Sequence, residues 1–158
     1  MDNFTLQSSP TRANYLGHSD IPGYGTEAWT PILDFNGGTT GITYGQQYGQ
    51  YVTVGNLIFA FYKIVLTSKG SSTGSARLGN LPLRTASSSG DTYHKGQGGF
   101  VSYWQDMTSA LITIVMQMGS NHVFFRGGIA GAVTLAVLTD TDFSDTTEIC
   151  GTIIYTNP

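Results

Sequence analysis

The sequence predicts an all-β fold, an antiparallel β-sandwich of the jelly-roll kind with a short extended N-terminal arm. Segments rich in β-branched and aromatic residues recur along the chain, and Gly, Asn, Asp or Ser interrupts them about every 8–12 residues. Apolar residues do not recur with a sustained helical period. Residues 103–118 are the one stretch where a helix is credible, and even there the alternation within 110–118 favours a strand.

We place the arm at residues 1–28 and the sandwich domain at residues 29–158. Prolines and glycines, among them Pro10 and Pro22, punctuate a polar N-terminal stretch without any period. Isolated apolar residues in such a stretch favour an arm that becomes ordered against a partner, while a disordered leader is the alternative. The apolar residues predicted to dock are Phe4, Leu6, Tyr15 and Leu16.

The expected strands follow from the same pattern. Asn36, Gly37 and Gly38 form a break after the first strand, and residues 69–74 form a Gly/Ser turn from which the next strand returns. The expected strand segments are residues 32–35, 50–54, 57–66, 76–83, 100–104, 110–118, 122–126, 132–138 and 149–155.

The segment 57–66 is apolar on both sides. Ile58, Ala60, Tyr62, Ile64 and Leu66 share one face by alternation, and Leu57, Phe59 and Phe61 share the other until Lys63. A strand carries apolar residues on both faces when it is buried on both sides, or when a neighbouring subunit buries one of them. We therefore predict that Leu57, Phe59 and Phe61 form a subunit interface.

Composition excludes several classes of function. Charged residues make up 11% of the chain, against about 25% in an ordinary soluble domain, and the formal net charge is −3. Seven scattered Lys and Arg residues make no basic stripe, so nucleic-acid binding is not expected. Apolar runs of about ten residues are half of what a membrane-spanning helix needs. Met1 to Thr5 have no character of a secretory signal, so we expect synthesis in a cytoplasm.

The motifs that carry chemistry are weak, and we predict no enzyme, cofactor or metal site. Residues 70–74 match G-x-S-x-G, but Gly79 and Pro82 prevent the helix that a nucleophile elbow requires. Cys150 is the only cysteine, and the three histidines have no paired spacing. The carboxylates Asp140, Asp142, Asp145 and Glu148 leave two alternatives open, a calcium loop or a solvated connection between strands.

One loop has the composition of a recognition surface. Aromatic rings stack on sugar faces, and polar groups beside them hydrogen-bond to hydroxyls; the same mixture also suits protein contacts. The alternative is that the aromatic residues only anchor the loop to the core. The candidate receptor or glycan residues are Asp91, Tyr93, His94, Lys95, Tyr103 and Trp104.

Residues 29–83 resemble the end domains of bacteriophage tail fibres. The resemblance lies in Trp29 to Phe35, Gly41 to Tyr44 and Gly49 to Gly55, followed by the long strand, the turn at 69–74 and Gly79 to Pro82. Gly151 to Tyr155 is similar to the final strand of that family. The resemblance implies a non-enzymatic, homotrimeric β-sandwich on the outer surface of a virion.

Two functions follow from this resemblance. Only some 28 residues precede the sandwich, which favours a homotrimeric capsid decoration (cement) protein whose arm docks on the major capsid protein or another virion protein. The alternative is a tail-fibre tip that uses the 91–104 loop to bind a host-surface glycan or receptor.

Overall fold

The computed structural model of the chain describes residues 24–82, 98–108, 113–118, 122–128, 131 and 134–156. Apart from the short 3₁₀ turn η4 (Asp140–Asp142), the regular elements of these residues are antiparallel strands, which confirms the all-β prediction. The strands are β1 (Tyr24–Trp29), β2 (Ile32–Phe35), β3 (Ile42–Val54), β4 (Leu57–Lys69), β5 (Ala76–Gly79), β6 (Gly98–Met107), β7 (Thr113–Met118), β8 (Val123–Gly128), β9 (Ala136–Val137) and β10 (Phe143–Thr156).

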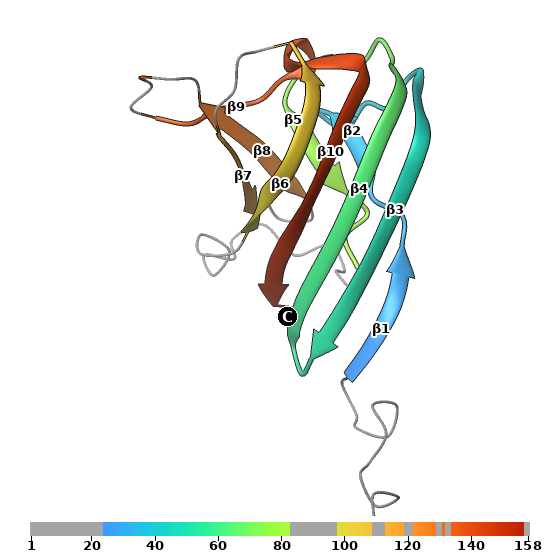
Figure 1. The fold of residues 1–158 in the computed structure, drawn as a ribbon, viewed down its shortest axis with the longest axis vertical. Helices are drawn as coiled ribbons and strands as arrows, with labels where there is room; N and C mark the ends of the chain where they lie inside the picture. The colour runs from blue at the N-terminus through green and yellow to red at the C-terminus, as the bar shows by residue number, and fades with distance from the viewer. Residues whose placement is uncertain are drawn as a thin grey trace, which may run out of the picture.

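The strands form one hydrogen-bonded path that folds over into two layers. Its order is β1-β3-β4-β10-β6-β7-β8-β5-β2, with β9 paired to β8. The long strands β3, β4 and β10 lie side by side with β6 in the front layer of Figure 1, and β8, β5 and β2 lie behind them. The result is the sandwich that the sequence predicts.

Aromatic side chains join the two layers. The ring of Tyr62 on β4 meets Phe125 on β8 edge to face, with centroids 6.4 Å apart. Phe143 on β10 packs in the same way against Phe35 on β2 at 5.4 Å and against Phe125 at 6.0 Å. Because these rings come from β2, β4, β8 and β10, the core depends on contacts between residues far apart in sequence.

The outer edge of β2 is satisfied by side chains of β3. The hydroxyl of Tyr44 accepts a hydrogen bond from the Leu33 N–H at 3.1 Å and donates one to the Leu33 carbonyl at 3.3 Å. The amide of Gln47 donates to the Pro31 carbonyl at 2.8 Å. A strand edge presents unpaired backbone groups, and these side chains occupy some of them.

Several strand predictions need correction; β10, for example, begins at Phe143 and not at residue 149. β3 begins at Ile42, well before residue 50, because Gly and Gln residues at 45–47 and 49 interrupt the β-branched and aromatic pattern that signals a strand. β5 does not return beside β4 but pairs with β2 and β8 in the other layer. Gly70 and Gly74 have φ values of +70° and +114°, which let the turn leave the β4 direction.

The sheet also begins earlier than the predicted domain boundary. Residues 24–28, assigned to the arm, belong to β1, in which Tyr24 to Trp29 pair with Val54 to Gly49. The rest of the arm, with its docking residues Phe4, Leu6, Tyr15 and Leu16, lies outside the described residues.

The one stretch in which a helix was credible contains strands. β6 ends at Met107 and β7 begins at Thr113. Within the part of the chain that the structure describes, no helix is long and apolar enough to cross a membrane.

Candidate functional site

The outward side of β4 carries the predicted interface residues. The inward residues of this strand, from Ile58 to Leu66, are buried, as the alternation predicts. On the other side Leu57 and Phe59 are half-buried, and Phe61 is 44% exposed. A phenylalanine left this exposed in one copy of the chain is a surface on which another molecule gains by packing.

Neighbouring strands extend this apolar surface. We call the outward side of β3, β4, β10 and β6 the outer face; strand register places its residues in rows. One row is Gln50, Phe61, Thr152 and Phe100, and the next is Val52, Phe59, Ile154 and Gly98. All the large hydrophobic side chains found exposed among the described residues lie on this face: Tyr48, Val54, Phe61, Phe100, Tyr103 and Ile154.

Tyr103 and Trp104, two of the predicted recognition residues, point to opposite faces of β6, and a β-bulge sets which of them points outward. The register between β6 and β10 shifts between Cys150 and Gly151, after which Tyr103 lies opposite Cys150 on the outer face. Trp104 lies opposite Ile149 and packs against the core. The two aromatic residues therefore do not share one recognition surface.

The other members of the predicted recognition loop, Asp91, Tyr93, His94 and Lys95, lie outside the described residues. Of the six candidates, the structure places only Tyr103 and Trp104. Tyr103 is 45% exposed and remains available to a partner.

Two tyrosines on the outer face are held by the same local contact. The hydroxyl of Tyr48 donates to Oε1 of Gln50 at 3.3 Å, and that of Tyr103 donates to Oε1 of Gln105 at 2.5 Å. In both cases the glutamine is two residues along the same strand, so both side chains point the same way. These hydrogen bonds restrain the exposed rings.

Two residues of opposite charge on the outer face, Lys63 and Glu148, form an ion pair. Nζ of Lys63 lies 2.8 Å from Oε1 of Glu148. The hydrogen bond to Glu148 raises the pKa of Lys63, so the amine stays protonated at neutral pH. Cys150 lies directly opposite Lys63 in the register, and burial raises the pKa of its thiol.

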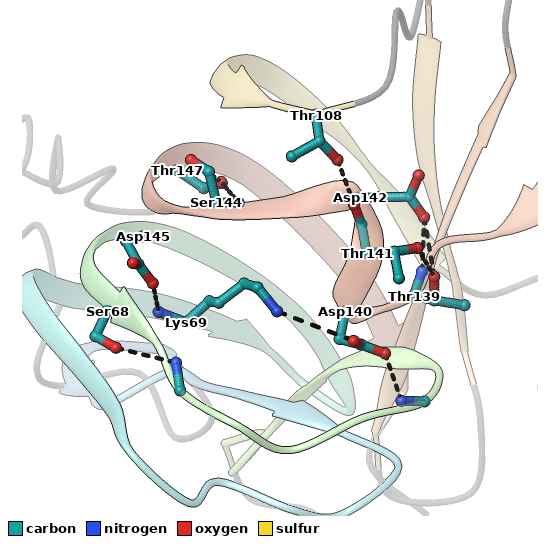
Figure 2. Close-up of polar contacts among 12 residues, drawn as sticks. Ser68, Lys69, Thr108, Thr139, Asp140, Thr141, Asp142, Ser144, Asp145 and Thr147 are labelled. Atoms are coloured by element: carbon teal, nitrogen blue, oxygen red, sulfur yellow. Dashed lines mark hydrogen bonds and ion pairs between the residues drawn. The ribbon is translucent and has the colours of Figure 1, made fainter.

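The acidic segment at one end of the sandwich has structural roles (Figure 2). Asp140 accepts a hydrogen bond from the Gly74 N–H at 2.7 Å and lies 3.9 Å from Nζ of Lys69. Asp145 accepts from the Lys69 N–H at 2.8 Å, and Asp142 accepts from the Thr139 N–H at 2.8 Å. Asp145 and Asp140 thus bind the backbone at the end of β4 and in the turn that follows it, and Asp142 binds the backbone at the start of its own 3₁₀ turn.

Their arrangement does not support the calcium alternative. Glu148, the fourth carboxylate, is paired with Lys63 on the outer face. In the part of the chain that the structure describes, no three His, Cys, Asp or Glu side chains gather closely enough to hold a metal ion.

The G-x-S-x-G segment is a turn. Oγ of Ser72 accepts a hydrogen bond from the Thr40 N–H at 2.9 Å, and the strand β5 follows the turn. The serine is thus bound to the β2–β3 connection, and the helix of a nucleophile elbow does not follow it, as the sequence analysis predicts.

Comparison with known proteins shows the fold. No known protein family matches the chain, and no curated protein matches its sequence. Among solved structures, the chain is similar to the crystal structure of the Dettilon tailspike protein (gp208), with a TM-score of 0.61 and 18% sequence identity. The similarity covers 83% of this chain and 23% of the tailspike chain, so the chain spans about a quarter of that protein's length.

Proposed function

We propose that this chain is a non-enzymatic structural module of a bacteriophage virion, exposed on the outer surface of the particle and assembled as a homotrimer. The observation that carries the proposal is the similarity of most of the chain to part of a tailspike protein. The resemblance of residues 29–83 to tail-fibre ends supports the same class, on the separate ground of sequence motifs.

Within the virion, the tail is the position that we propose. A tailspike is a solved structure to which this chain is similar in fold, and this favours a tail-fibre or tailspike module over a head decoration protein. Head decoration stays an alternative, because its predicted docking residues, such as Phe4 and Tyr15, lie outside the described residues.

The homotrimer places the outward side of β4 between subunits. Leu57, Phe59 and Phe61 are the predicted interface residues, and the exposure of Phe61 supports that role. Burying such side chains stabilises an assembly by about 25 cal/mol for each Å² of apolar surface removed from water.

A receptor- or glycan-binding role of the tail module depends on the 91–104 segment. Of the two candidate residues of this segment that the structure describes, Tyr103 has an exposed ring, whereas Trp104 packs against the core. A test of recognition therefore uses Tyr93→Ala and Lys95→Ala, with the mass of the assembled protein as a control, because Trp104→Ala also removes core contacts and Tyr103 lies on the outer face.

The position is tested with gold-labelled antibody against this chain on intact particles of the source virus, viewed by electron microscopy. Label at the tail or fibre ends supports the proposal, and label spread evenly over the head supports decoration instead. Absence of label from particles, with the purified protein labelled as a control, contradicts a virion-surface protein of either kind.

A further inference from the structure

The outer face differs in character from the opposite side of the molecule. It carries every exposed large hydrophobic side chain found among the residues whose exposure the structure describes, whereas the outward positions of β5 and β8 carry half-buried residues, among them Arg77, Phe124 and Arg126. Exposed apolar residues scattered singly are ordinary on a soluble protein, but a contiguous set on one face marks a contact surface.

The outer face is large enough for a stable contact. Its rows run along β4 from Leu57 to Val65 and span the width of β3, β4, β10 and β6. With about 3.3 Å per residue and about 4.8 Å between strands, this area is roughly 600 Å². Stable interfaces bury about 600–1,000 Å² on each partner, so this face alone reaches the lower end of that range.

The charge of the outer face favours a second copy of the chain as its partner. Lys63 and Glu148 are the charged residues in these rows, and they neutralise each other at 2.8 Å. Two copies of a face without net charge approach without repulsion, whereas a strongly charged partner gains nothing there.

We infer that copies of this chain contact one another through the whole outer face, so that Tyr103, Phe100 and Ile154 on β6 and β10 are interface residues along with Phe61. This inference rests on the proposed homotrimer and adds the extent of its interface. It goes beyond the strand that the sequence indicated, because β10 and β6 are brought beside β4 only by the fold.

The reactivity of Cys150, the one cysteine of the sequence, can be used to detect this contact in the unsubstituted chain. Cys150 lies in the row of Tyr48, Lys63 and Tyr103, and it is half-buried in one copy of the chain. If a second copy covers the outer face, a thiol reagent loses access to Cys150.

The experiment measures the rate of maleimide labelling of Cys150 in the assembled full-length chain, at one fixed pH, against the denatured protein. A matched control is Ser71→Cys in a Cys150→Ser background, because Ser71 is exposed in a turn away from the outer face. Phe61→Glu and, independently, Phe100→Glu place an uncompensated charge on the face, and Thr39→Glu places the same charge in an exposed turn outside it.

We expect labelling of Cys150 in the assembled protein to be at least about tenfold slower than in Phe61→Glu or Phe100→Glu. Ser71→Cys should label rapidly throughout, and Thr39→Glu should behave like the unsubstituted chain. Rapid labelling of Cys150 in a protein of trimeric mass overturns the inference but leaves the proposed trimer standing. Equal protection in the assembled chain and in a folded monomeric variant also overturns it, since one copy then shields the thiol by itself.

Discussion

Tyr103 and Trp104 are adjacent in the chain, yet Tyr103 lies on the outer face and Trp104 packs against the core. The extra residue at the β6 bulge sets which of the two points outward. Because of this arrangement, one residue is available for contact with a partner and its neighbour contributes to the stability of the fold.

Substitution of each residue should separate these two roles. Trp104→Ala removes a large, partly buried side chain and should lower the free energy of unfolding by about 3 kcal/mol. Tyr103→Ala should cost less than about 1 kcal/mol in the dissociated chain, because its ring is exposed. Chemical denaturation of both variants measures the difference, and equal losses would contradict the opposite orientations of the two side chains.

The absence of a side chain at Gly49 leaves room for the indole of Trp29 against β3. A Cβ at position 49 would lie 2.5 Å from Nε1 of Trp29, which donates a hydrogen bond to the Phe61 carbonyl at 3.1 Å. Gly49→Ala should therefore displace the indole, lower the free energy of unfolding by about 1–3 kcal/mol and change tryptophan fluorescence.

Gly79→Ala is the matched control, because a Cβ there makes only ordinary contacts, at 3.5 Å or more. In a chain that already carries Trp29→Ala, Gly49→Ala should cause no further loss in the free energy of unfolding. An unchanged cost in that background would show that the indole is not what Gly49 accommodates.

The stability of the fold should depend on pH through His122. Burial lowers the pKa of His122 from 6.5, and the Arg77 guanidinium lowers it further, while Asp34 acts in the opposite direction. Below pH 6.5 His122 takes up a proton in the unfolded chain more readily than in the folded chain. The contribution of His122 to the free energy of unfolding is therefore fully present above pH 6.5, and it is lost as the pH falls from 6.5 toward the lowered pKa of the folded chain.

Urea midpoints at about pH 7.5 and about pH 5.5 measure this loss. The decline between the two values should be smaller in His122→Gln than in the unsubstituted chain. An equal decline in both proteins would assign the pH dependence to other groups.

Asp140 should stabilise the fold without calcium. Asp140→Asn removes the ion pair with Lys69 and weakens the hydrogen bond from the Gly74 N–H, so we expect a loss of about 1–2 kcal/mol. Asp145→Asn should cost less because Asp145 is exposed. Thermal unfolding with calcium or with a chelator should give the same midpoint, and a higher midpoint in calcium would restore the metal interpretation.

The sequence predicts the alternating strands well, because alternation is local. The division of 57–66 into the buried residues from Ile58 to Leu66 and the outward Leu57, Phe59 and Phe61 agrees with the structure. The three successive apolar residues Ile153, Ile154 and Tyr155 carry a similar signal for β10, a strand with apolar residues on both sides.

The pairing of strands is not local and could not be read in the same way. That β10 lies between β4 and β6, which brings Phe61, Thr152 and Phe100 into one row, depends on contacts across the whole chain. The bulge that turns Tyr103 outward and Trp104 inward likewise depends on a single extra residue, which composition does not mark. The outer face therefore could not be predicted from the sequence and is defined only by the pairing of the strands.

The most direct test of this account is the mass of the purified chain in solution, measured by light scattering or sedimentation. We expect three times the mass of one chain, and the mass of one chain for Phe61→Glu with its strand content unchanged. A single-chain mass for the unsubstituted protein at micromolar concentration would contradict it, because the exposed aromatic residues of the outer face would then have no second copy to cover them.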